Sequence, residues 1–176
     1  MAGAAPRSLW DFSVEVYARP GVAPACLALQ DRLGVDVNLL LLCCWAGANG
    51  RLLSNLDLAA ALTGVREWQD EIVRPLRALR RRLKAGVAGI PTDQAEAMRR
   101  RVGDLELEAE RIAQMRLAAS PPKFALQVPA GPGPAFANLE FYFDLLGLAA
   151  APADSTDLEA LVCGCFPVGV NSADDE

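Results

Sequence analysis

Apolar residues recur at helical spacing through the first 64 residues, and glycine or proline separates one run from the next. Ala and Leu dominate these runs, whereas Val, Ile and Thr are sparse, which favours helix over sheet. The third run is apolar nearly all round and therefore predicts a central helix, with Asp36 as its cap. A fourth, short helix should end at Gly64. The predicted helices cover residues 9–19, with Ser8 as the cap, then 22–33, 37–48 and 56–62.

Two long apolar stripes follow. The first, over residues 65–83, has spacings of 3, 4, 4, 3 and 4, and Pro75 within it predicts a kink or a break near Val73–Arg74. The second, over residues 98–112, has spacings of 4, 3, 4 and 3, as in the seam of a coiled coil. Only the short segment KAGVAGIPTD joins the two stripes. The pattern therefore predicts a long antiparallel helical hairpin.

The last third of the chain predicts a tethered helical segment. Pro and Gly are frequent over residues 120–135, which indicates a linker. Helices are expected over residues 136–148 and 155–165. We therefore predict a single all-α domain in which the hairpin packs on the N-terminal helices. Its parts are a helical bundle (1–119), the linker (120–135), C-terminal helices packing on the bundle (136–166) and a disordered acidic tail (167–176).

Composition narrows the chemistry that this domain can perform. The chain has no histidine, which removes Ser–His and Cys–His nucleophile pairs, imidazole bases and most zinc and iron sites. We therefore predict no cofactor, and an enzyme is less expected without being excluded. The longest apolar run, Leu39 to Ala46, is shorter than the ~20 residues that cross a bilayer, and no secretory signal is apparent. Five cysteines, an odd number, suit reduced thiols in a cytoplasmic protein.

A basic block stands out in a chain of net charge −5. Residues 65–91 carry seven basic and three acidic groups, whereas residues 120–176 carry one and eight. The candidate basic face comprises Arg74, Arg77, Arg81 and Lys84 on one side of the helix, with Arg80 and Arg82 flanking it. These side chains either complement the helix dipole and pair with Glu on neighbouring helices, or they bind an anionic partner. With few aromatic residues nearby and an acidic chain, an acidic protein segment is preferred over RNA, and the chain's own tail is one candidate.

A second candidate is the polar corner formed by Gln30, Asp31, Asp36 and Asn38, which interrupts an otherwise apolar stretch. Asp36 and Asn38 flank the start of the central helix, where unpaired N–H groups attract a carboxylate. The corner is either a hydrogen-bonded joint, in which Asp31 meets a basic side chain, or a polar pocket for a small ligand. The first reading is preferred.

The cysteines give weaker evidence of a functional site than the basic face and the polar corner do. Cys43 and Cys44 point about 100° apart on one helix, so they are expected to be small core residues rather than a chelating pair. Cys163 and Cys165 supply only two soft ligands, which is an incomplete metal site. No metal site is therefore predicted, and a redox role for this last pair is left open.

The stretches ACLALQD and GVDVNLLLLCCW, followed by the Arg-rich VRPLRALRRRLK and the Glu-rich LELEAER, resemble a family of short, uncharacterised bacterial proteins. The resemblance covers roughly residues 8–148 and implies a helical, cytoplasmic protein. It implies no reaction and no ligand. The leading hypothesis is a non-catalytic interaction or adaptor protein that binds another protein through the basic face. Self-association through leftover apolar helix faces fits the positive mean hydropathy, +0.19. The alternative is a small-molecule-binding protein or enzyme that uses the polar corner.

Overall fold

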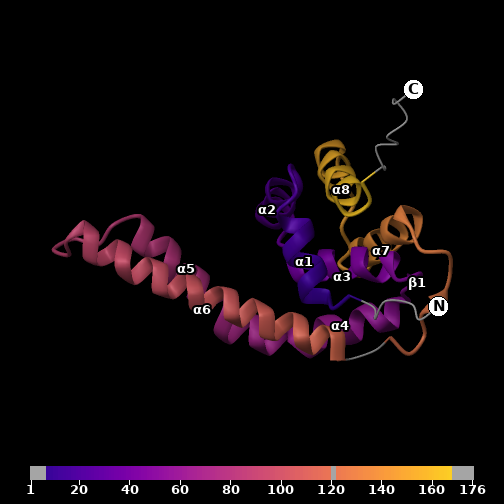
Figure 1. Ribbon diagram of the computed structural model, residues 1–176, viewed down its shortest axis with the longest axis horizontal. Helices are drawn as coiled ribbons and strands as arrows, with labels where there is room; N and C mark the ends of the chain where they lie inside the picture. The colour runs from indigo at the N-terminus through magenta and orange to yellow at the C-terminus, as the bar shows by residue number, and fades with distance from the viewer. Residues whose placement is uncertain (1–6, 120–121, 168–176) are drawn as a thin grey trace, which may run out of the picture. The chain divides into compact units, whose positions relative to one another are not determined.

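A computed structural model describes residues 7–119 and 122–167 of the chain. The regular secondary structure of these residues is helical, apart from one antiparallel pair of two-residue strands, which confirms the predicted all-α class (Figure 1). They fall into two compact units that meet within one helix, α4 (Asn55–Trp68). The first unit comprises residues 7–58 and 122–167, and the second comprises residues 59–119.

The first unit is built around α3 (Val37–Ala48), of which nine of twelve residues are buried. Helix α7 (Pro132–Leu145) packs along α3, and α8 (Pro152–Cys165) packs along α2 (Val22–Leu33). Helix α1 (Leu9–Tyr17) covers another part of α3. The central position predicted for the third apolar run is therefore confirmed, because α3 is enclosed by helices from both ends of the chain.

The segment interpreted as a linker contains more structure than the sequence predicts. Strand β2 (Leu126–Gln127) pairs antiparallel with β1 (Arg51–Leu52) directly after α3. Helix α7 begins at Pro132 rather than at residue 136, and α8 begins at Pro152 rather than at residue 155. Proline is tolerated in the first turn of a helix because its missing N–H has no partner there in any case. Two of the prolines that suggested a linker, Pro132 and Pro134, thus lie in the first turn of α7.

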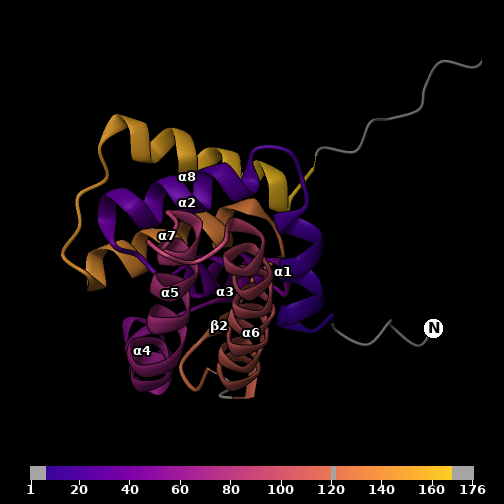
Figure 2. The same ribbon diagram turned by 90° about the vertical axis from the view of Figure 1, so that its left-hand side faces the viewer.

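The second unit is the predicted antiparallel hairpin (Figure 2). One arm contains the end of α4, a π-helical turn over Gln69–Val73 and α5 (Arg74–Lys84); the other is α6 (Thr92–Ala119). The indole N–H of Trp68 donates to the carbonyl of Ala109 at 2.9 Å. Residues later in the first arm pair with residues earlier in α6, which establishes the antiparallel direction.

Two local expectations need correction. The helix predicted over residues 56–62 does not end at Gly64 but continues to Trp68, because a single glycine costs a helix only about 1 kcal/mol and Val65 beyond it is buried. The break predicted near Val73–Arg74 is a widened turn, in which the N–H of Arg74 donates to the carbonyl of Gln69. Pro75 follows this turn and lacks the N–H that a regular ladder would use.

The first unit combines segments that are far apart in the sequence. The sequence pattern groups residues 1–119 as one bundle, whereas the helices of the first unit come from both ends of the chain. The packing of the hairpin on the N-terminal helices remains a prediction. The predicted disorder of the tail concerns residues 167–176, of which residues 168–176 lie outside the described residues.

Candidate functional site

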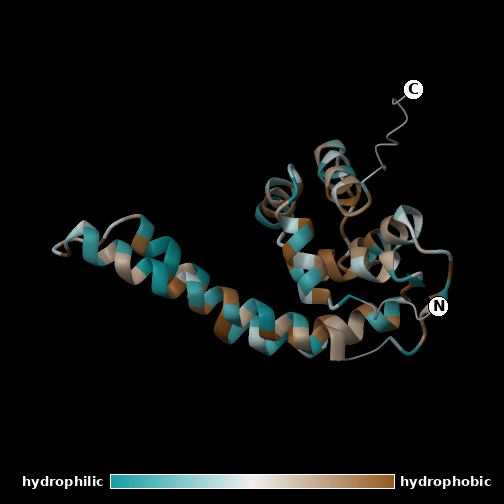
Figure 3. Cartoon of the chain, in the orientation of Figure 1, coloured by the Kyte–Doolittle hydropathy of each residue, from teal (hydrophilic) through white to brown (hydrophobic). Residues whose placement is uncertain are grey.

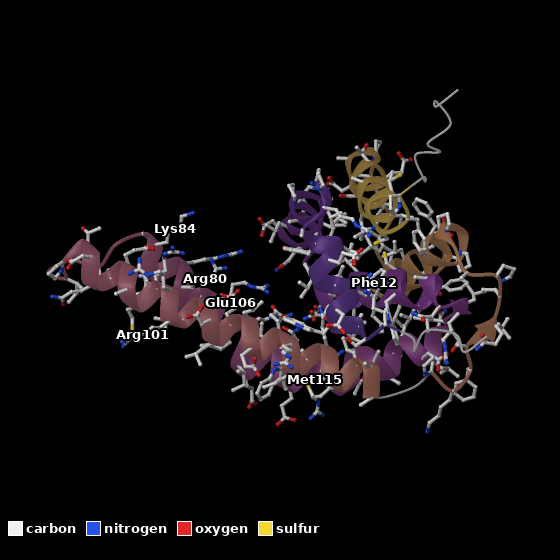
Figure 4. All side chains as sticks on the ribbon, in the orientation of Figure 1. Phe12, Arg80, Lys84, Arg101, Glu106 and Met115 are labelled. Carbon is white, nitrogen blue, oxygen red and sulfur yellow. The ribbon has the colours of Figure 1, made fainter. Side chains whose placement is uncertain are left out.

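The basic face lies on α5, an eleven-residue helix with six basic and no acidic side chains. Successive residues of an α-helix are about 100° apart, so Arg74, Arg77, Arg81 and Lys84 lie on one side of α5. Lys84 and Arg101, which are both near the tip of the hairpin, extend from opposite sides of it (Figure 4). Arg74, Arg77, Arg81 and Lys84 therefore share one side of the hairpin, opposite to Arg101.

Two of the arginines hold the hairpin together. Arg77 donates from Nε to Glu106 Oε1 at 3.2 Å and from its terminal nitrogen to Glu110 Oε1 at 2.5 Å. Arg80 donates from Nε to the other oxygen of Glu106 at 2.5 Å (Figure 4). Burial alone would raise the pKa of Glu106, but the hydrogen bonds from Arg80 and Arg77 outweigh it and hold that pKa below the ordinary value. Glu106 is thus a buried carboxylate neutralised across the hairpin.

The other members of the basic face make local contacts or face solvent. Arg74 pairs with Asp70 one turn before it, and Arg82 donates to the carbonyl of Gly86. Arg81 and Lys84 are exposed. The predicted pairing with Glu of a neighbouring helix is therefore present at Arg77 and Arg80, whereas Arg74 pairs within its own arm. Binding of a partner by the basic face stays a prediction.

Positive charge is concentrated in the tip half of the hairpin. The tip half of the hairpin, residues 74–103, contains nine basic and two acidic residues. The base half, residues 59–73 and 104–119, contains three basic and seven acidic residues. The hairpin is therefore positive at its tip and negative at its base, and the basic face belongs to the positive half.

The polar corner is organised as a helix joint. Asp36 caps α3, with its Oδ1 accepting from the backbone N–H of Asn38 at 2.8 Å, as predicted. The N–H of Asp36 donates to the hydroxyl of Tyr142 on α7 at 3.0 Å. Burial raises the pKa of Tyr142, so this phenol stays protonated. The carbonyl of Gln30 accepts from the N–H of Gly34 where α2 ends, and Asp31 is exposed.

The basic side chain beside this corner binds carboxylates of α8. Arg32 donates from two nitrogens to Asp154 Oδ1 at 2.9 and 2.8 Å, and it also pairs with Asp157 at 2.5 Å. Asp154 is buried, and the hydrogen bonds from Arg32 hold its pKa below the ordinary value. Arg32 therefore ties the end of α2 to the start of α8. Binding of a ligand at the corner stays a prediction.

Sequence reasoning missed two buried polar residues that organise the first unit. Asn138 on α7 is fully buried and bonds three backbone groups of other segments. Asp57 at the start of α4 accepts hydrogen bonds from Ser54 and from the backbone of Lys123 and Phe124. A signal existed for Asn138, which lies between Ala135 and Tyr142 on the apolar side of its helix. An amide at such a position indicates a buried hydrogen-bond partner.

The cysteines are mostly core residues. Cys26, Cys43, Cys44 and Cys165 are buried, whereas Cys163 is exposed. Burial raises the pKa of Cys26 to about 12. The pKa of Cys44 is raised mainly by a hydrogen bond with Cys165 and also by burial. Cys26 and Cys44 are therefore protonated thiols at neutral pH. Cys163 and Cys165 lie on different sides of α8, because two residues of an α-helix separate them by about 200°.

A pocket of about 240 Å³ lies in the second unit between α4 and α6. Small side chains form most of its wall, and its one charged lining residue, Arg116, donates to the carbonyl of Gly64 at 3.2 Å. Its lining residues are Ala60, Ala61, Gly64, Val65, Arg116, Leu117 and Ala119. Such a wall supplies little polar recognition for a ligand.

Comparison with protein families gives a match over residues 8–117 to a family described as a protein of unknown function, DUF2390. The chain belongs to this family. The expected membership of an uncharacterised family is thereby confirmed. The match includes both the polar corner and the basic face and ends within α6, so α7 and α8 lie beyond it. Neither the curated proteins nor the solved structures gave a match. No helix among the described residues of this DUF2390 protein has the length and apolar character needed to span a bilayer.

Proposed function

We propose that this protein is a non-catalytic, cytoplasmic interaction protein that binds an acidic segment of another protein through the basic face of α5. The observation that supports it is the positive charge of the tip half, which keeps a surplus of four after Arg74, Arg77 and Arg80 are taken as neutralised by carboxylates of the base half. Basic side chains that only complemented neighbouring carboxylates would leave no such surplus. Lys84 and Arg81 extend this charge to the exposed side of the helix.

An acidic protein segment suits this face better than a nucleic acid. Helix α5, RPLRALRRRLK, has no aromatic side chain on which a base could stack. The chain as a whole has a net charge of −5, which repels a long polyanion outside the basic block. A short acidic segment contacts the basic block alone and avoids that repulsion.

A non-catalytic role is supported by how the buried ionisable groups are used. Glu106, Asp57 and Asp154 each accept several hydrogen bonds that hold the structure together, and each has a lowered pKa. A general acid or base needs a pKa near the working pH, which calls for a raised carboxyl pKa instead. These carboxylates therefore act as structural anions.

The test is binding of a fluorescent peptide of about 20 residues, rich in Asp and Glu, measured by anisotropy at two salt concentrations. Lys84→Glu should weaken binding about fivefold, because it reverses a charge on the basic face. Arg101→Glu is the matched control, since it makes the same charge change on the opposite side of the hairpin. Arg77 and Arg80 are unsuitable for substitution because they hold Glu106.

Equal weakening by the two substitutions would mean that the peptide senses only overall charge, and the proposal would be wrong. Absence of peptide binding by the wild-type protein would also contradict it. An RNA of about 20 nucleotides serves as the comparison polyanion. If the RNA bound more tightly than the peptide, a nucleic-acid partner would replace the acidic protein.

A further inference from the structure

We propose that two copies of this protein associate through an apolar face of the hairpin, with the tip of each hairpin on the base of the other. The apolar face comprises Ile72, Leu79, Met98, Leu105 and Ile112. Four of these side chains are substantially exposed: Ile72 by 38%, Leu79 by 43%, Met98 by 49% and Leu105 by 59%. This inference concerns a different side of the hairpin from the basic face and does not depend on the proposed function.

Helical geometry places these residues on one side of the hairpin. Met98, Leu105 and Ile112 are seven residues apart on α6, which brings each about 20° from the one before it. They flank the buried seam on the side away from Glu106 and Glu110. On the other arm, Leu79 likewise flanks the seam away from Arg77.

The antiparallel pairing then aligns the two flanks. Each helix of an antiparallel pair can be viewed from its own N-terminus. Side chains that are then rotated in the same sense from the buried seam lie on the same face of the pair. Arg77 and Glu110 meet on one face, so Leu79 and Leu105 share the opposite one. They are also level along the hairpin, because Arg80 pairs with Glu106.

Two helices alone cannot bury these stripes. Over its whole described length α5 has no buried residue, although it carries three leucines. Figure 3 shows apolar residues recurring along both arms of the hairpin between polar ones. Large apolar side chains gathered on one exposed face are typical of an interaction surface. Two hairpins joined at this face would form a four-helix bundle, which buries such stripes completely.

The distribution of charge along the hairpin favours an antiparallel orientation of the two copies. Once the three ion pairs that join the halves are set aside (Arg74–Asp70, Arg77–Glu110 and Arg80–Glu106), the tip half keeps a surplus of four positive charges and the base half a surplus of one negative charge. Antiparallel association places each positive tip on a negative base, whereas parallel association would place two positive tips together. A two-fold arrangement of identical surfaces is also the commonest form of homodimer. Helix α6, with 28 residues or about 42 Å, is long enough for both contacts.

Sedimentation equilibrium of the full chain tests this proposal. The wild-type protein should have twice the 18.7 kDa mass of one chain at about 100 µM and should dissociate on dilution. Leu105→Glu should give a monomer, because it places a charge in the centre of the apolar face. Leu107→Glu is the matched control, since Leu107 has the same 59% exposure but lies on another side of α6, and it should remain dimeric.

A wild-type monomer at about 100 µM, or the same effect from both substitutions, would overturn the proposal. The salt dependence tests the orientation. Antiparallel dimers should weaken as salt screens the attraction between tip and base, so a dimer that tightens with salt would contradict that arrangement. Leu105→Glu should still bind the acidic peptide, which separates failure of the dimer from failure of the proposed function.

Discussion

A single buried amide connects three backbone segments of the first unit. The side-chain oxygen of Asn138 accepts from the N–H of Leu53 at 2.7 Å, and its nitrogen donates to the carbonyls of Cys43 and Arg51 at 3.1 and 3.0 Å. One N–H and two carbonyls must be satisfied at this point, and only an amide supplies both an acceptor and two donors. Asn138 thereby fixes α7 against the end of α3 and the strand that follows it.

Asp57 also connects separate segments of the first unit, through a charged carboxylate instead of an amide. Its Oδ1 accepts from the N–H groups of Lys123 and Phe124 at 2.7 and 3.2 Å, and its Oδ2 accepts from the hydroxyl of Ser54 at 2.8 Å. Burial opposes the charged form, but these hydrogen bonds together outweigh it and lower the pKa of Asp57. The carboxylate thus joins the start of α4 to the segment that precedes β2.

We expect Asp57 to make the stability of the protein depend on pH. A carboxyl whose pKa is lowered by folding contributes stability that is complete above about pH 5 and is lost as the pH falls through the folded-state pKa. Asp57→Asn should cost about 2 kcal/mol at pH 7, because an amide has one acceptor oxygen where the carboxylate has two. The difference between the two proteins should shrink below about pH 4. Urea unfolding at a series of pH values measures this difference in the free energy of unfolding.

Asp144→Asn is the control for this experiment, because Asp144 is exposed on α7. Its effect on the free energy of unfolding should be small at every pH. A cost for Asp57→Asn that stayed constant between pH 7 and pH 3 would show that the charge of Asp57 does not stabilise the fold.

At the scale of the helices, a close contact determines how α3 and α7 pack. A Cβ added to Gly47 would lie 2.5 Å from the backbone nitrogen of Ala135 and 2.7 Å from its Cα. Backbone atoms cannot move aside as the end of a flexible side chain does. Gly64, in the middle of α4, has no described atom within 4 Å of such a Cβ.

These two glycines should respond oppositely to the same substitution. Gly47→Ala should destabilise the protein by about 2 kcal/mol, because the helices must separate. Gly64→Ala should stabilise it by about 0.5–1 kcal/mol, because alanine is the better helix former and the site has room. Thermal unfolding of both variants measures the sign. A loss of stability in Gly64→Ala would mean that the glycine serves a purpose other than helix continuity.

The two arms of the hairpin should depend on Glu106 but not on Glu108. Glu106→Gln removes the charge that Arg77 and Arg80 share and should cost about 2 kcal/mol, since two partly buried arginines lose their partner. Glu108 is exposed and lies 3.7 Å from Arg111, so Glu108→Gln should cost less than about 0.5 kcal/mol. Urea unfolding followed by helical circular dichroism compares the two variants. Equal costs would contradict the role given to Glu106.

The elements that the sequence predicts best are those whose ends have a local cause. Helices α2 and α3 have the predicted bounds because Gly34, at a φ of +69°, ends one and Asp36 caps the other. The helix end predicted at Gly64 was wrong. Glycine ends a helix where its backbone takes a positive φ, and packing decides whether it does so. The packing of α7 on α3 and of Arg32 on Asp154 joins residues about a hundred positions apart. Periodicity carries no information about such pairs.

In the candidate site too, local features could be predicted from the sequence and long-range contacts could not. The spacing of Arg74, Arg77 and Arg81 predicts a shared face from sequence alone, because helix geometry is local. Which arginines are neutralised could not be predicted, since it depends on the register between α5 and α6. The caps follow the local rule as well, so Asp36 was predictable and its contact with Tyr142 was not.

At the scale of the whole molecule, the two units bury their helices to very different degrees. Nine of the twelve residues of α3 are buried, whereas none of the eleven residues of α5 is, both helices being described throughout. Buried apolar contact is the main source of local stability, so a hairpin with exposed stripes should open more readily than the first unit. A partner on the apolar face would supply the missing burial.

Hydrogen exchange read by mass spectrometry should therefore separate the units. At about 1 µM, where the proposed dimer is dissociated, amides of α5 should exchange at least about tenfold faster than those of α3. At about 100 µM exchange in α5 and α6 should slow, because association protects only the surface that it covers, while α3 should be unchanged. Leu105→Glu should abolish this concentration dependence and Leu107→Glu should retain it. If α5 and α3 exchanged together in dilute solution, the two units would open as one, and the hairpin would need no second copy to be stable.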